Sequence, residues 1–241
     1  MTHFTRLIVA VAIAAMAASA QARKAGDWVL GGGVLHYAPQ DKSQPLRMTS
    51  PVQQELAGSG ASVRSATTLG LTAHYFVDDN WAVEGVIGVP PRINLDGSGT
   101  FAPLGRMGSA RLWAPSILGK YFAGRPNDRF RVSLGAGLSY NRFRSVHLTS
   151  ALQDTMSDEM GLPPGGSSTS ASIGSKWAPV FNLGANYDLG NNWGISASVS
   201  WIPLKVRANL TTSADGQTIA ASTTKIRLNP VVPFAYLTYR F

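Results

Sequence analysis

The sequence predicts an all-β fold, an eight-stranded antiparallel transmembrane β-barrel with short periplasmic turns and long extracellular loops. Three observations predict it. Apolar and small polar residues alternate over segments of about twelve residues, roughly twice the usual length of a soluble strand. The connectors between these segments are alternately short and long, as in outer-membrane barrels. Beyond the N-terminal run, no stretch reaches the about 18 consecutive apolar residues of a membrane helix, so this chain has to cross a membrane as strands.

The N-terminus has the pattern of a secretory signal peptide. Arg6 precedes the apolar run 7–18, and Ala18-Ser19-Ala20 offers a small-residue cleavage site. A single transmembrane anchor is the alternative, but the run is short for a span of roughly 20 residues. We therefore expect residues 1–20 to be removed and residues 21–241 to form one transmembrane β-barrel domain.

The strands and connectors follow from period-2 alternation, which is clearest where Phe130, Val132 and Leu134 alternate with Arg131 and Ser133. The eight predicted strands are 26–38, 63–76, 81–90, 111–123, 130–143, 175–188, 193–207 and 224–241. The short connectors, rich in Asp, Asn and Gly as tight turns require, are 77–80, 124–129 and 189–192. The long polar segments, which we interpret as loops, are 39–62, 91–110, 144–174 and 208–223.

The direction of the side chains distinguishes a membrane barrel from a soluble one. The apolar rows begin or end on aromatic residues such as Trp177, Tyr187, Trp193 and Trp201, which suits two interfacial girdles. A soluble lipocalin-type barrel is the alternative, with its apolar row inside. The opposite row here is Gly, Ser, Asn and Arg, which is better suited to a lumen than to a solvent-facing coat. We therefore expect the apolar row to face lipid.

The last strand ends the chain on an aromatic residue. Tyr239 and Phe241 fall on the outward side, and Thr238 and Arg240 fall on the inward side. An exposed edge strand of this kind is a liability unless it pairs with the first strand of a closed barrel. Tyr239 and Phe241 resemble the C-terminal signal by which outer-membrane barrels are recognised, so the barrel-assembly machinery is an expected partner.

The inward row divides into a polar and an apolar part. Towards the periplasmic end we expect a charge network that blocks a water pore, formed by Glu84, Lys120, Arg131 and Arg240. Towards the loop end the row becomes apolar, at Leu35, Tyr37, Leu112, Val180, Ile202, Leu204, Val232 and Phe234. Apolar side chains facing a water-filled mouth need a cover, so they form either a pocket for a small hydrophobic solute or a simple plug.

Six segments together resemble the outer membrane protein W family over nearly the whole mature length. They are GDWV at 26–29, LGLTAHYF at 69–76, DNWAVE at 79–84, GAGLSY at 135–140, WAPVFNLGANY at 177–187, and LNP at 228–230 with YRF at 239–241. The resemblance implies a barrel in the outer membrane of a Gram-negative bacterium that lets small hydrophobic molecules cross. It also implies a lateral exit where a proline interrupts the third strand.

Pro90 occupies the position of that proline. Proline has no backbone donor, so it removes a hydrogen bond from the strand ladder. Pro91 departs from the family pattern, which usually has an aromatic residue there. We expect the lateral exit at Pro90 and Pro91.

The formal net charge of +8 requires an anionic partner or a solvated surface. Nucleic acid is disfavoured because the arginines are not interleaved with stacking aromatics. Many cations lie where strands meet long loops, namely Arg92, Arg106, Arg111, Arg142, Arg144, Lys176, Lys205, Arg207, Lys225 and Arg227. We expect either a collar that binds the phosphates of outer-membrane lipid and lipopolysaccharide or scattered solvated charges.

No residue pattern indicates catalysis, a cofactor or a metal site. His74 is expected inside the barrel and His147 in a loop, and no nucleophile-elbow sequence accompanies the serines. Asp154 and Asp158 share one loop without adequate further ligands. The chain has no cysteine, which excludes thiolate sites. The alternative to transport is a non-conducting surface or structural barrel whose loops bind host, phage or bacteriocin.

Overall fold

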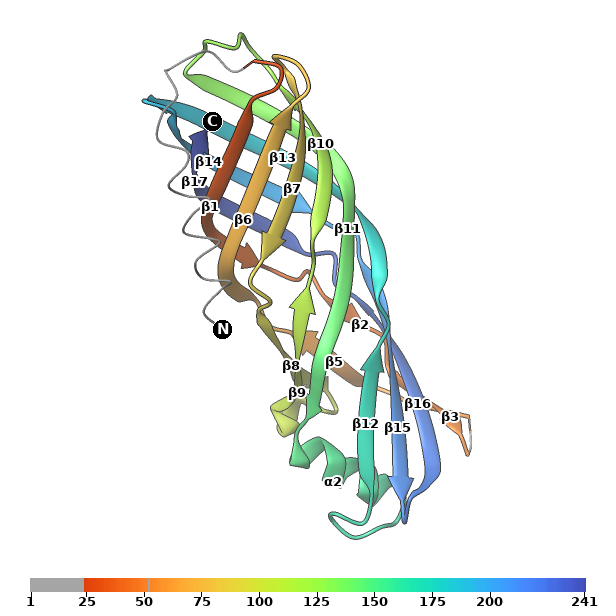
Figure 1. The fold of residues 1–241 in the computed structure, drawn as a ribbon. Coiled ribbons are helices and arrows are strands. Elements are labelled where there is room, and N and C mark those ends of the chain that lie inside the picture. Colours follow the sequence, from red (N-terminus) through yellow and green to blue (C-terminus); the bar gives the residue numbers. More distant parts are fainter. Residues whose placement is uncertain (1–23, 52) are drawn as a thin grey trace.

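One end of the molecule is a closed antiparallel barrel of eight strands (Figure 1). The computed structural model describes residues 24–51 and 53–241, so the expected signal peptide, residues 1–20, lies outside the described residues. The barrel strands are β1 (Trp28–Tyr37), β6 (Ala66–Phe76), β7 (Trp81–Gly88), β10 (Ser116–Phe122), β11 (Phe130–Leu148), β13 (Lys176–Gly190), β14 (Trp193–Trp201) and β17 (Val231–Arg240). β17 pairs with β1, and β10 pairs with β11, so the ring has no free edge. The predicted architecture is confirmed.

Short turns join the strands at one end of the barrel, as expected. Asp78 closes the turn after β6, where its Oδ1 accepts hydrogen bonds of 2.7 Å from the backbone N–H groups of Asn80 and Trp81. Between β13 and β14 the chain turns through Asn191 and Asn192, whose φ angles are 50° and 68°. Asn tolerates this left-handed region better than most residues, which explains why this turn is Asn-rich.

The large apolar side chains of the barrel face outward, also as predicted. All six tryptophans are 41–60% exposed. Near the short-turn end, Trp28 packs on Tyr75 and Trp193 packs on Tyr239, each pair with ring centroids 5.1 Å apart. Nearer the other end, Trp177 packs on Tyr140 at 5.0 Å. The outer wall therefore carries two aromatic belts, as a barrel in lipid requires.

The long segments interpreted as loops do connect the barrel strands at one end, and the structure adds that much of their length forms two further sheets, which extend the barrel (Figure 1). We call this part the extension. One sheet joins the upper part of β11 to β9 (Arg106–Trp113), β8 (Arg92–Gly99) and β5 (Ser59–Val63). The other contains β12 (Ser168–Ile173), β15 (Lys205–Ala214), β16 (Gln217–Arg227), β3 (Leu46–Ser50), β4 (Gln54–Leu56) and β2 (Lys42–Ser43).

Two short helices lie in the extension. The 3-10 helix η1 spans Ala102–Leu104, and α2 spans Ser150–Glu159 at the far end of the molecule (Figure 1). Leu152 and Met156 of α2 are buried and pack with Leu46 and Met107 of the two sheets. Residues 24–51 and 53–241 contain no helix long and apolar enough to cross a membrane.

Three of the predicted strands are broken at prolines where the barrel meets the extension. The predicted strand 111–123 is interrupted at Pro115, 193–207 at Pro203, and 224–241 at Pro230. Proline cannot donate to a strand ladder, so an apolar alternation that continues past it does not imply a continuous strand. β11 contains no proline and runs from the barrel into the extension without a break.

Candidate functional site

The inward row of the barrel encloses a cavity of about 80 Å³ on its extension side, which we call the inner cavity. Seven of the eight predicted pocket residues line it, namely Leu35, Tyr37, Leu112, Val180, Ile202, Val232 and Phe234. The eighth, Leu204, is fully buried in the same apolar core but does not line the cavity. The alternation of the strands therefore brings this set together, because successive side chains point to opposite faces.

Below the inner cavity, polar side chains fill the barrel. Glu84 lines the cavity floor, where its carboxylate lies 3.0 Å from His74 Nε2 and 3.2 Å from Lys120 Nζ. Thr72 donates a hydrogen bond of 2.9 Å to the same carboxylate. Glu84 and His74 are each 2% exposed, and Lys120 is 0% exposed. Eight strands leave an interior that side chains just fill, and this group occupies it.

The expected network of four charged residues is smaller in the structure. Arg131 forms no ion pair with Glu84 in the described part of the chain; its guanidinium donates hydrogen bonds to the backbone carbonyls of Phe122 at 2.7 Å and Asp79 at 3.0 Å. The guanidinium nitrogen Nη1 of Arg240 lies 3.9 Å from the carboxylate oxygen Oδ2 of Asp188 at the short-turn end of the barrel. Both arginines are drawn to acceptors at the turns, so the central ion pair consists of Glu84 and Lys120 with His74 beside them.

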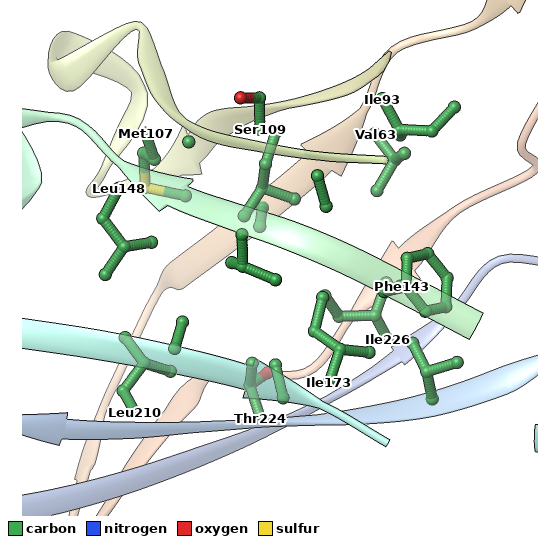
Figure 2. Close-up of a pocket in the computed structure, with 18 of the residues that line it drawn as sticks. Val63, Ile93, Met107, Ser109, Phe143, Leu148, Ile173, Leu210, Thr224 and Ile226 are labelled. Carbon is green, nitrogen blue, oxygen red and sulfur yellow. The ribbon is translucent and has the colours of Figure 1, made fainter. Parts of the chain in front are cut away.

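A second apolar cavity of about 120 Å³ lies between the two sheets of the extension, and we call it the outer cavity. In Figure 2, Met107, Leu148 and Val63 lie opposite Leu210 and Ile226. This cavity was not predicted, because most of its lining residues belong to the long segments interpreted as loops. The alternation of Val206, Ala208 and Leu210 with Lys205, Arg207 and Asn209 was a usable signal.

Tyr37 lines both cavities. It is the last residue of β1 and is 4% exposed. Its hydroxyl oxygen has no hydrogen-bond partner among the described residues. The ring therefore lies where the inner and outer cavities meet, and the two cavities follow one another along the barrel axis.

The barrel wall is interrupted beside the inner cavity. The ladder between β7 and β10 stops at Val86 and Ser116, and the ladder between β8 and β9 begins at Arg92 and Arg111. The residues between them include Pro90 and Pro91 on one side and Ala114 and Pro115 on the other. Gly88, Pro91 and Ala114 also line the inner cavity. The predicted exit residues thus lie at a real break in the strand pairing, next to the apolar lumen.

The C-terminal aromatic pair lies at the short-turn end. The rings of Tyr239 and Phe241 have centroids 4.9 Å apart, and the Phe241 N–H donates a 2.8 Å hydrogen bond to the carbonyl of Trp28. The end of the chain is therefore attached to the start of β1. An assembly role for Tyr239 and Phe241 stays a prediction.

Comparisons with known proteins agree with this arrangement. The OmpW family model matches residues 24–241. Outer membrane protein W of Vibrio cholerae is 28% identical over 240 residues, covering 97% of each chain. The dibenzothiophene metabolism operon protein PahQ of Pseudomonas aeruginosa is 24% identical, covering 65% of each. The crystal structure of the outer membrane protein OprG from Pseudomonas aeruginosa superposes with a TM-score of 0.78 at 25% identity, covering 92% of this chain and 99% of that one.

Proposed function

The chain belongs to the OmpW family of Gram-negative outer-membrane barrels, and from this premise we propose that it passes small hydrophobic molecules into or across the outer membrane. Its short turns face the periplasm and its extension is extracellular. The relatives compared above have no enzyme names, and we propose no catalytic step.

The observation that carries the proposal is the pair of apolar cavities that meet at Tyr37 above a filled polar section. An apolar solute leaving water for these walls gains about 25 cal/mol per Å² of buried surface, so about 200 Å² gives about 5 kcal/mol. That gain is enough for weak binding and still permits release. The two cavities, of about 120 and 80 Å³, together exceed the about 150 Å³ of an aliphatic-lined cavity that binds benzene.

A lateral exit near Pro90 and Pro91 fits this arrangement better than passage along the axis. Beneath the inner cavity, Lys120 and Ser133 are no more than 1% exposed, which indicates that side chains fill the axis. Between the end of the β7–β10 ladder at Val86 and the start of the β8–β9 ladder at Arg92, the two sides are joined, among the described residues, by one backbone hydrogen bond, from the Leu112 N–H to the Pro91 carbonyl at 3.1 Å, so few hydrogen bonds oppose their separation. A hydrophobic solute that leaves there enters lipid rather than water.

The name of one relative supports the class of solute. PahQ is named for an operon of dibenzothiophene metabolism, and dibenzothiophene is an apolar fused-ring compound. We therefore propose hydrophobic molecules, including aromatic ones, as the solutes of this barrel.

Uptake of a hydrophobic fluorescent probe by cells that contain the protein tests the proposal. Replacing Val180 and Phe234 by Asn places unpaired amides in the inner cavity, and we expect the uptake rate to fall by about tenfold or more. Thr218→Asn, on the exposed outside of β16, is the matched control and should leave uptake unchanged. Circular dichroism checks that each variant is a folded barrel. Wild-type uptake by the folded double variant would instead favour a non-conducting surface barrel whose extension binds host, phage or bacteriocin.

A further inference from the structure

Three arginines of the extension lie side by side on adjacent strands with no acidic partner. Arg92 is directly opposite Arg111 in the β8–β9 ladder, and Arg111 is directly opposite Arg144 in the β9–β11 ladder. All three are exposed, while the neighbouring Ile93 and Leu112 point inward to the apolar core. We call them the arginine row. Like charges directly opposite each other destabilise a sheet, so a bound anion would stabilise this arrangement.

A second group of cations lies on the other sheet. Lys205 is opposite Arg227, and Arg207 is opposite Lys225, in the β15–β16 ladder. These four side chains are exposed, and the intervening Val206 and Ile226 line the outer cavity. None of these four residues and none of the arginine row forms an ion pair within residues 24–51 and 53–241. Two faces of the molecule therefore carry the same uncompensated positive charge.

The height of these cations relative to the membrane is defined by the aromatic belt. Arg111 lies two residues beyond Trp113 on the same face of β9, which is about 7 Å along the strand. The headgroup region on each side of a bilayer is about 5–8 Å deep. Lys205 likewise follows the belt residue Trp201 after the break at Pro203. The cations thus lie at the level of the lipid headgroups.

Acidic residues of the extension lie mostly farther from the membrane. Asp96, which forms an ion pair with Arg64, is four residues beyond Arg92. Others lie on β4, on α2 and in the β15–β16 turn, namely Glu55, Asp154, Asp158, Glu159 and Asp215. Asp41 is the exception, and its carboxylate accepts a 2.8 Å hydrogen bond from the Val63 N–H. Arg106 was expected in the collar. It pairs in register with Asp96, so it lies farther from the membrane than the arginine row.

We propose that the arginine row is a binding site for the phosphate groups of an anionic outer-leaflet glycolipid, with the Lys205–Arg207–Lys225–Arg227 group as a second contact on the opposite sheet. A guanidinium group can donate two parallel hydrogen bonds to one phosphate. Three adjacent arginines can therefore bind one phosphate together or several neighbouring phosphates. The phosphate cancels the repulsion within the row, so the glycolipid also stabilises the sheet that covers the outer cavity. The side chains of this site are exposed and line neither cavity, so phosphate binding does not require a solute in the lumen.

Binding of purified lipopolysaccharide to the protein in phosphatidylcholine nanodiscs tests this site. We expect Arg92→Gln/Arg111→Gln/Arg144→Gln to weaken binding by about tenfold or more. The matched control removes three exposed cations at the periplasmic end, Lys24→Gln/Arg125→Gln/Arg129→Gln, and should change the affinity by no more than about twofold. Enzymatically dephosphorylated lipopolysaccharide should bind wild type and triple variant equally weakly.

Three outcomes would overturn the proposal: wild-type affinity of the triple variant, an equal loss in the control, or binding of millimolar inorganic phosphate in place of the glycolipid. The last would make the row a site for free phosphate. Urea unfolding provides a check that does not depend on affinity. Without glycolipid, the triple variant should unfold at a higher urea concentration than wild type, because the repulsion is gone. With glycolipid, this order should reverse. The single variant Arg111→Gln, in the middle of the row, should show both effects in weaker form.

Discussion

At the scale of single residues, Glu84 is the counter-charge for Lys120 in the middle of the barrel. Its carboxylate lies 3.2 Å from Lys120 Nζ and 3.0 Å from His74 Nε2, and all three side chains are buried. Burying a charge is costly unless it is paired, so the lysine depends on this one carboxylate. The polar section is therefore a structural element of the barrel as well as the floor of the inner cavity.

Replacing Glu84 by Gln should destabilise the barrel by about 3–5 kcal/mol, because it leaves a buried ammonium group without a counter-ion. Equilibrium unfolding by urea in lipid vesicles measures this loss. Adding Lys120→Met removes the unpaired charge, so Glu84→Gln/Lys120→Met should be much closer to wild type. A single variant as stable as wild type would show that water or another group compensates Lys120.

The residues of the inner cavity could be predicted from the sequence, but the role of Tyr37 could not. Val180, Val232 and Phe234 alternate with lipid-facing residues, and period 2 alone assigns their direction. Tyr37 has the same alternation, yet its position between two cavities depends on the outer cavity. That cavity exists only because two sheets from distant parts of the chain lie opposite each other. Period 2 within one strand carries no information about such packing.

At the scale of elements, prolines mark the boundary between barrel and extension. The breaks at Pro91, Pro115, Pro203 and Pro230 lie between strands of the barrel and strands of the extension. The sequence alternation continues on both sides of Pro203 and Pro230, which is why 193–207 and 224–241 were each predicted as one strand. Because most of β15 and β16 is polar, residues 208–223 were interpreted as a loop. Val206, Ala208 and Leu210 nevertheless keep the alternation.

A reversible disulfide across the interruption at Pro90 and Pro91 should reduce solute uptake. Extending the β7–β10 register by two residues places Gly88 opposite Ala114. A side chain at Gly88 has room, since its Cβ would approach no atom closer than 3.5 Å. Oxidised Gly88→Cys/Ala114→Cys should therefore take up the hydrophobic probe several-fold more slowly than its reduced form, with crosslinking confirmed by mass spectrometry.

The control for this experiment is an engineered disulfide between two strands that are already hydrogen-bonded to each other. Ala73 is opposite Gly85 in the β6–β7 ladder, and no atom lies within 4 Å of a Cβ built at Gly85. Ala73→Cys/Gly85→Cys should give the same uptake in both redox states. Equal uptake by the oxidised and reduced forms of the Gly88–Ala114 pair would place the exit elsewhere.

At the scale of the whole molecule, the side-chain types form layers along the long axis. The periplasmic aromatic belt, the lipid-facing apolar wall, the outer aromatic belt and the headgroup-level cations follow one another in that order. Inside, the polar section and the two apolar cavities follow one another along the same axis. The outer layers fix the depth of the barrel in the membrane, and this depth places the interruption at Pro90 and Pro91 near the outer aromatic belt, where the lipid begins.

This layering predicts how lipids quench the tryptophan fluorescence. Trp28, Trp81 and Trp193 lie in the periplasmic belt, the other three lie towards the extension, and all six face outward. In phosphatidylcholine vesicles, bromine near the headgroup end of the acyl chains should therefore quench the emission more than bromine at the chain ends, because both belts lie at the interfaces. Protein unfolded in urea, mixed with the same vesicles, should show little quenching of either kind. Stronger quenching by chain-end bromine, or complete quenching by aqueous iodide, would contradict this depth, and with it the position of the exit relative to the lipid.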